Sequence, residues 1–275
     1  MPGFWRRLLG SRSAIVGITI LSVVVVVAAS APILFPESPF RRVDRPFQPP
    51  FGAHLFGTDV LGRNVAAGIA HGARTSLLIG LLATTVAVMV GTAIGGIAGY
   101  YGGRIDDALM RVTEFFQTIP TFLFAIILVA ILAPSIRSIV IAIAVVSWPA
   151  VARLVRGEFL ALRHREFVYA CICLGMRDRR VIFRHVLPNC LSPIIVTGSL
   201  TVATAILLES ALSFLGLGDP NVMSWGFMIG AGRTFLRTAW WLCTIPGMAI
   251  LLTVLAINLL GEGLNDSLNP RLRNS

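Results

Sequence analysis

The chain alternates long apolar runs with short polar connections. Six runs carry almost no charge, at residues 14–34, 76–99, 119–133, 138–152, 191–215 and 241–260. About 20 apolar helical residues cross the roughly 30 Å hydrocarbon core of a bilayer. The pattern therefore predicts an all-α polytopic membrane protein with six transmembrane helices. The third and fourth runs are short, so we expect those helices to extend into the flanking polar sequence.

These runs divide the chain into a terminus at 1–13, a first transmembrane helix at 14–34, a loop at 35–75, a five-helix core at 76–262 and a tail at 263–275. The loop at 35–75 is rich in proline, which disfavours regular structure. Polar connections at 153–190 and 216–240 interrupt the core. Cleavage of the first run as a signal peptide is an alternative, since Ala29-Ser30-Ala31 resembles a cleavage site, but the run is long for that role.

Composition agrees with a membrane protein and narrows its chemistry. The chain is 56% apolar and only 13% charged, about half the charged fraction of a soluble domain. All 23 basic residues are arginine, so the chain has neither a phosphate-loop lysine nor a Schiff-base lysine. The net charge of +10 is distributed over loops rather than along a nucleic-acid-binding stripe, and we expect no nucleic-acid partner.

The distribution of arginine predicts the orientation. With the amino end in the cytoplasm, 15 arginines lie on the cytoplasmic side and eight outside. Positively charged loops favour the cytoplasm. We therefore expect both termini and the connection at 153–190 to be cytoplasmic.

Three small residues in the second run recur every fourth position, at Gly91, Gly95 and Gly99. Such a stripe lies on one helix face and lets another helix approach closely. The partner helix can belong to this chain or to a second subunit, and the sequence leaves both open.

The basic connection between the fourth and fifth runs has the pattern of a bent helical pair. Residues 166–174 can form a short helix, and Gly175 follows where a helix commonly ends in the left-handed conformation. Asp178 is suited to begin a second segment, and Pro188 to the first turn of the fifth run. An ordinary basic loop with an amphipathic helix is the simpler alternative.

The spacing in this connection resembles the "EAA" loop of ABC importer permeases, which is Glu-Ala-Ala, three residues, Gly, nine residues and Ile-x-Leu-Pro. The corresponding residues here are Tyr169-Ala170-Cys171, Gly175 and His185-Val186-Leu187-Pro188. Tyr169, Cys171 and His185 depart from the pattern. Glu166, one turn before Tyr169, is our candidate to replace the missing glutamate.

Further segments are similar to the peptide and nickel branch of that family, in its C-type permease. They lie in the same order along the chain, at residues 54–63, 72–77, 99–103, 148–157, 212–218, 224–226 and 258–264. The resemblance thus runs nearly from end to end.

The resemblance implies a type I ABC importer permease fold and a position in the inner membrane of a prokaryote. It implies a homologous second permease, two ATP-binding subunits or domains that hold ATP and Mg, an extracytoplasmic substrate-binding protein and a peptide substrate. Membrane lipid is a further expected partner. This chain would then be a transport subunit without catalysis, cofactor or metal of its own. Its ATPase-coupling residues would be Glu166, Phe167, Tyr169, Ala170, Cys171, Leu174, Gly175, His185, Leu187 and Pro188.

An acidic residue interrupts the fifth run at Glu209. Ionisable groups in hydrocarbon are costly and face the protein interior or a wet cavity. Glu209 and Ser213 are therefore candidate path-lining or gating residues, although a hydrogen-bonded structural carboxyl is the alternative. His54 and Asp59, or His71, are of metal-binding types, but their mixed spacing and the lack of a third ligand do not favour a metal site.

Other functions remain as alternatives. The same scaffold can import nickel or another small solute. A stand-alone secondary transporter would have inverted repeats and ionisable groups near the midplane. The sequence shows no internal repeat, and Glu209 is the only such ionisable group. A membrane enzyme would need a cluster of catalytic side chains at one membrane face.

Overall fold

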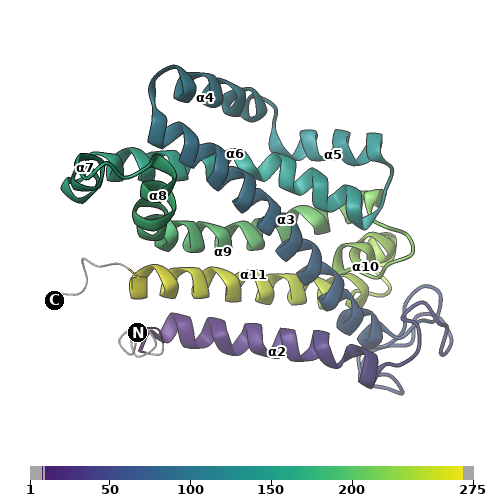
Figure 1. The fold of residues 1–275 in the computed structure, drawn as a ribbon. Helices are drawn as coiled ribbons and strands as arrows, with labels where there is room; N and C mark the ends of the chain where they lie inside the picture. The colour runs from purple at the N-terminus through teal and green to yellow at the C-terminus, as the bar shows by residue number, and fades with distance from the viewer. Residues whose placement is uncertain (1–7, 9, 269–275) are drawn as a thin grey trace.

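The computed structural model describes residues 8 and 10–268, and it confirms an all-α fold. Arg6, Arg7, Arg271 and Arg273, which we expect on the cytoplasmic side, lie outside the described residues. Long helices run side by side, and shorter ones lie across both ends of the bundle (Figure 1). The helices are α2 (Arg12–Leu34), α3 (Val65–Tyr101), α4 (Gly103–Thr118), α5 (Thr121–Leu132), α6 (Ile136–Arg163), α7 (Glu166–Cys173), α8 (Asp178–Val181), η1 (Ile182–Val186), α9 (Leu187–Leu212), η2 (Ser213–Leu217), α10 (Trp225–Gly232), η3 (Arg233–Phe235) and α11 (Trp241–Leu268).

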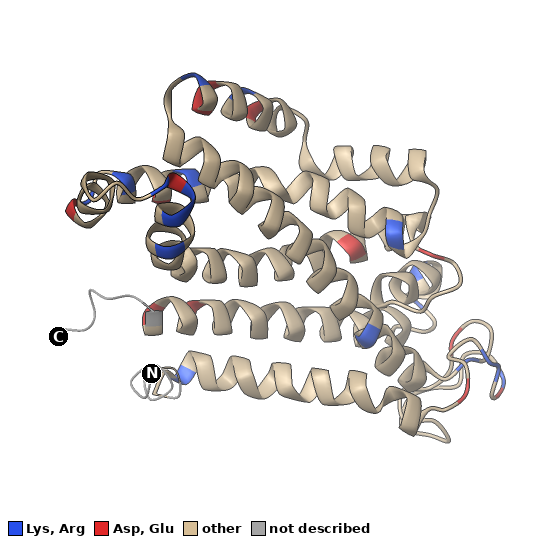
Figure 2. Cartoon of the chain, viewed as in Figure 1, with Lys and Arg blue, Asp and Glu red and all other residues tan. Residues whose placement is uncertain are grey.

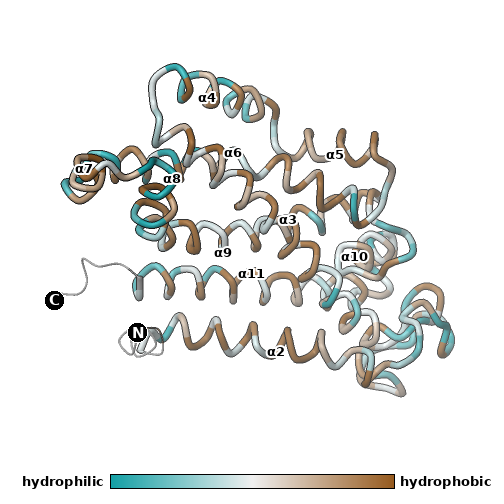
Figure 3. Tube along the Cα trace, in the orientation of Figure 1, coloured by the Kyte–Doolittle hydropathy of each residue, from teal (hydrophilic) through white to brown (hydrophobic). Residues whose placement is uncertain are grey.

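Five of these elements are long and apolar enough to cross a membrane: α2, α3, α6, α11, and α9 with its flanking segments. Apolar sequence occupies the middle of the bundle, whereas charged residues gather at its two ends (Figures 2 and 3). This is the distribution that a bilayer requires of a spanning protein.

The third predicted run, at 119–133, lies in a bent pair of helices rather than in one straight helix, and it makes a sixth span only if the pair is counted as one. Helices α4 and α5 meet at 85°, and α5 has only 12 residues. The break follows from Pro120, which restricts the preceding residue, Ile119, to an extended conformation. The expected extension of the third run into polar sequence is therefore wrong for a straight helix, whereas the fourth run does extend, as α6.

Other boundaries also differ from the sequence expectation. Helix α3 begins at Val65, because the side chain of Asn64 caps it by accepting a hydrogen bond from the Ala66 amide. The irregular loop thus ends at residue 64, not 75. Helix α6 continues through the first part of the connection at 153–190, and α10 occupies part of the connection at 216–240.

The centre of the bundle is the contact between α3 and α6. A Cβ at Gly91 would lie 2.6 Å from the Cβ of Val151, and one at Gly99 would lie 2.6 Å from the Cβ of Phe159. At Gly95 it would collide with the carbonyl of Ala152. The small-residue stripe therefore packs against a helix of the same chain.

The start of α2 and the end of α11 lie at the same end of the bundle as α7 and α8 (Figure 1). The loop at 35–64 and helix α10 lie at the opposite end (Figure 1). The bent pair α4–α5 also leads from the elbow end to the opposite end, so the chain passes along the bundle an even number of times (Figure 1).

Candidate functional site: the α7–α9 elbow and its surroundings

The elbow, residues 166–188, is two short helical segments joined at Gly175. The amide of Gly175 donates to the Ile172 carbonyl at 2.9 Å, and that of Met176 donates to the Cys171 carbonyl at 3.1 Å. These two bonds form a Schellman motif, which ends a helix. Gly175 has φ +71, a conformation that side chains with a Cβ rarely adopt. The local sequence thus fixes the bend.

The inner face of the elbow is anchored in the bundle. Val168, Val181 and Val186 are fully buried and pack in one cluster with α6 and α9. The Tyr100 hydroxyl donates to the carboxylate of Asp178 at 2.9 Å, which ties α8 to the end of α3. Asp178 therefore serves in a tertiary contact, and its side chain makes no capping hydrogen bond in α8.

The outer face of the elbow is apolar and exposed. Leu174 is 76% exposed, and Phe167, Tyr169 and Ile172 are also exposed. The side chain of Tyr169 meets His164, whose Nδ1 lies 3.1 Å from the tyrosine hydroxyl. A rigidly anchored short helix with an uncovered apolar face has the form of a docking element.

The predicted coupling residues are distributed over both faces. Cys171 is buried, and His185 and Leu187 are half-buried. The exposed members are Glu166, Phe167, Tyr169, Ala170, Leu174, Gly175 and Pro188.

Glu209 lies in the interior, between α3 and the end of α9, with 0% exposure. Its carboxylate accepts hydrogen bonds from Ser213 at 2.8 Å, Ser76 at 3.1 Å and Ser210 at 3.4 Å. The chain then passes through η2, where Gly216 breaks the helix with φ +87. Sequence reasoning paired Glu209 with Ser213 but missed Ser76, which is 133 residues away.

Helix α4 contributes an ion pair at the elbow end of the bundle. Asp106 is nearly buried and pairs with Arg156 of α6 through bonds of 2.5 and 2.6 Å. The sequence did not predict this pair. Asp107, Arg111 and Glu114 have helical spacing, which was a signal for helix α4 itself. They line an open polar hollow of about 520 Å³ together with Met110, Thr113, Arg153 and Arg156.

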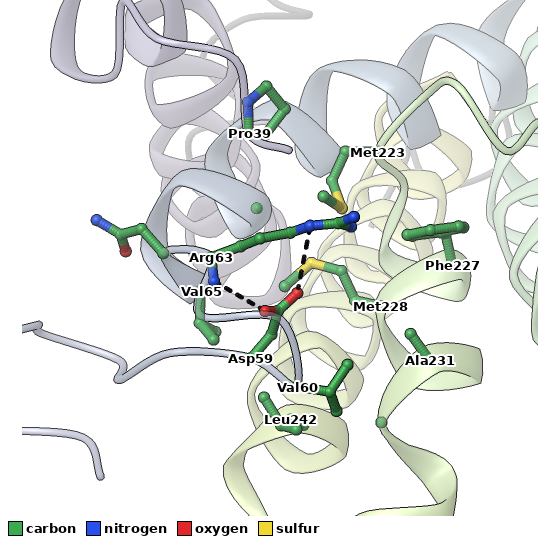
Figure 4. Close-up of a pocket in the computed structure, with 13 residues that line it drawn as sticks. Pro39, Asp59, Val60, Arg63, Val65, Met223, Phe227, Met228, Ala231 and Leu242 are labelled. Atoms are coloured by element: carbon green, nitrogen blue, oxygen red, sulfur yellow. Dashed lines mark hydrogen bonds and ion pairs between the residues drawn. The ribbon is translucent and has the colours of Figure 1, made fainter. Parts of the chain in front are cut away.

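At the opposite end, a small cavity lies where the loop meets α3 and α10 (Figure 4). Asp59 and Arg63 close one side of it, and Met223 and Met228 face them (Figure 4). Its volume is about 30 Å³, enough for about one or two water molecules. The cavity is thus a joint between elements and is too small for a peptide.

The loop at 35–64 is ordered by polar contacts. The Arg45 amide donates to the carboxylate of Asp44 and lowers its pKa, and His54, whose Nε2 lies 3.2 Å from Asp44, adds to this effect. His71 Nε2 lies 3.0 Å from the Phe35 carbonyl. Within residues 10–268, no three potential metal ligands come together.

The family described as binding-protein-dependent transport system inner membrane component matches residues 91–274. The N-terminal transmembrane domain of oligopeptide transport permease C matches residues 3–50.

Curated proteins that are similar over most of their length are permeases too. The dipeptide transport system permease protein of Alkalihalophilus pseudofirmus is 42% identical over 98% of this chain and 89% of its own length. The di/tripeptide permease of Pseudomonas aeruginosa is 39% identical, over 99% and 92%. The glutathione permease of Pectobacterium atrosepticum is 38% identical, over 98% and 91%.

Among solved structures, the inward-facing MetNI methionine ABC transporter has a chain with a TM-score of 0.58 and 14% identity, covering 70% of this chain and 91% of that one. That likeness supports the fold, a type I importer permease. Such permeases are transport components without a cofactor of their own. The chain therefore belongs to the inner-membrane permease family of binding-protein-dependent ABC importers.

Proposed function

We propose that this permease forms one half of a path for di- or oligopeptides, together with a homologous second permease. An extracytoplasmic binding protein would deliver the peptide. Two cytoplasmic subunits would bind ATP and Mg and drive the transport cycle. The names of the relatives, which are peptide and glutathione permeases, support this substrate class over nickel or another solute.

The elbow is the observation that carries this proposal. Its inner face is fixed by Val168, Val181 and the Tyr100–Asp178 bond, while Leu174 and its neighbours stay uncovered. A rigid base lets the outer face transmit a push from a docked ATPase into α6 and α9. The excess of arginine at this end supports a cytoplasmic position for the elbow and for both termini.

Glu166 is proposed to support docking in place of the glutamate that the family has at the position of Tyr169. It is exposed in the first turn of α7. We expect Glu166→Ala to uncouple ATP hydrolysis from transport while the complex still assembles. Unchanged transport would remove Glu166 from the mechanism.

The central experiment is affinity purification of the tagged chain from its native membrane, followed by mass spectrometry. We expect a second permease and P-loop ATPases to copurify. In proteoliposomes, this complex should hydrolyse ATP faster when a loaded binding protein is added, and should take up di- or oligopeptides rather than nickel chelates. Recovery of the chain alone from a mild detergent would favour a stand-alone transporter.

Glu209 and Ser213 are proposed to govern the outer gate rather than to contact peptide. The carboxylate joins α3 to the end of α9 just before the break at Gly216, from which the chain leads into α10. Movement of α10 would therefore strain these hydrogen bonds. Altered transport with unchanged peptide selectivity in Ser213→Ala would support a gating role, and altered selectivity would support contact with the path.

A further inference from the structure

A cluster of arginines lies on the outer side of α8 and η1. Arg177, Arg179, Arg180 and Arg184 are all exposed and surround an open hollow of about 520 Å³ together with Phe183. We call these five residues the basic patch. Figure 2 shows positive charge on this short segment at the elbow end of the bundle.

The charge of the patch is not compensated within the described part of the chain. The adjacent acid, Asp178, accepts a hydrogen bond from Tyr100 and is held toward α3. The ion pairs between described residues involve Arg41, His54, Arg63 and Arg156, and none includes a patch arginine. Four guanidinium groups are thus available to an external anion.

The position of the patch is fixed by the opposite face of the same segment. Val181 and Val186 are fully buried against the bundle, so the arginines face away from it. The segment runs directly into the spanning helix α9. The patch therefore lies at the charged start of this candidate span, and we expect it at the depth of the lipid headgroups.

An exposed apolar stripe continues from the patch along the span. Phe183 is 61% exposed, and Leu191 and Ile195, at further helical turns of α9, are about half exposed. A surface with cationic groups at the interface and apolar side chains below them matches the two parts of a phospholipid.

We propose that the basic patch binds the headgroup of an anionic phospholipid, with an acyl chain along Phe183, Leu191 and Ile195. Guanidinium groups match the geometry of phosphate oxygens through paired hydrogen bonds. A free phosphate would make no use of the apolar stripe. An acidic protein surface in the cytoplasm would not reach the part of the stripe that lies within the membrane.

The test is lipid binding to the complex copurified with this chain, measured by native mass spectrometry. Phosphatidylglycerol and phosphatidylcholine with the same acyl chains serve as probes. We expect tighter binding of phosphatidylglycerol, and a loss of about fivefold in affinity for each arginine removed in the triple variant R179Q/R180Q/R184Q. The triple lysine variant at these positions should retain most of the binding, because the charge remains.

The matched control is R41Q/R42Q/R45Q, which removes the same charge at the other end of the bundle and should leave this binding unchanged. F183A should weaken binding of both lipids. Equal loss in the control, no loss in the patch variant, or displacement by inorganic phosphate at the lipid concentration would overturn the proposal. So would release of the ATPases from the patch variant with lipid binding intact, because the arginines would then belong to that interface.

Discussion

The contact between α3 and α6 and the outer face of the elbow use apolar residues in opposite ways. At the first, glycines bring two backbones so close that no added carbon fits. At the second, Leu174 stands in open space, and a Cβ added at Gly175 would meet nothing within 4 Å. One surface is complete within the chain, and the other is uncovered.

This difference predicts that the two regions have separate roles, one in the stability of the fold and the other in coupling to the ATPases. Substitutions in the α3–α6 contact should destroy the folded permease, whereas substitutions on the elbow should leave the fold intact and affect docking. The following variants test this separation, from the largest expected effect to the smallest.

Gly95→Val should have the largest effect. The new side chain would occupy the space of the Ala152 carbonyl, and overpacking of this kind costs about 1–3 kcal/mol or more. We expect little monodisperse protein in size-exclusion chromatography. The control is Gly157→Ala, on the same pair of helices, where an added Cβ meets nothing within 4 Å. Normal yield of the Gly95→Val protein would show that the two helices can separate.

Glu209→Ala should be the next most damaging. It leaves a cavity and removes the acceptor from Ser76 and Ser213, which together cost about 2–4 kcal/mol. Thermal unfolding in detergent should show a clear decrease in Tm. Glu209→Gln keeps an acceptor oxygen and should lose much less. If Glu209→Ala unfolded at the wild-type temperature, the carboxylate would have no structural role.

Gly175→Ala should have a moderate and local effect. No atoms obstruct the methyl group, so the cost is backbone strain at positive φ, roughly 1–2 kcal/mol. Part of this strain can be relieved by opening the elbow. We expect near-normal Tm with reduced substrate-stimulated ATPase activity. Gly247→Ala, at another open position with no positive φ, should leave both unchanged.

Leu174→Ser should barely change stability, because the side chain is already exposed. We expect wild-type Tm but weaker retention of the ATPase subunits during purification. A matched substitution, Leu123→Ser on the exposed side of α5, should retain them. Loss of the ATPases from the α5 variant but not from the elbow variant would place the docking surface elsewhere.

Local signals allowed the elbow to be predicted from sequence. Gly175 and Pro188 act through the conformations they favour, and these effects depend little on distant residues. The apolar runs likewise predicted the long helices α2, α3, α6, α9 and α11. In both cases the information lies within a few turns of chain.

Features that depend on distant partners were not predicted. Asp106 and Arg156 are 50 residues apart. The residues around each of them give no sign of its partner. Helix α4 was missed because it is amphipathic and polar on average, and the first turns of α3 were missed because they contain His71 and Arg74. Those turns are stabilised by tertiary contact, since Gly72 packs against Trp225.

The early start of α3 has a mechanical consequence. With 37 residues, the helix is about 55 Å long, well beyond the roughly 30 Å of hydrocarbon. It packs in shared clusters with α6 over residues 79–99. Near its start, Gly68 and Gly72 contact Met228 and Trp225 of α10. A tilt of the whole helix by about 10° would displace one end relative to the other by roughly 10 Å. Helix α3 thus joins the packing beside the elbow to the packing around α10 in one continuous element, so a rotation at one end would displace residues at the other.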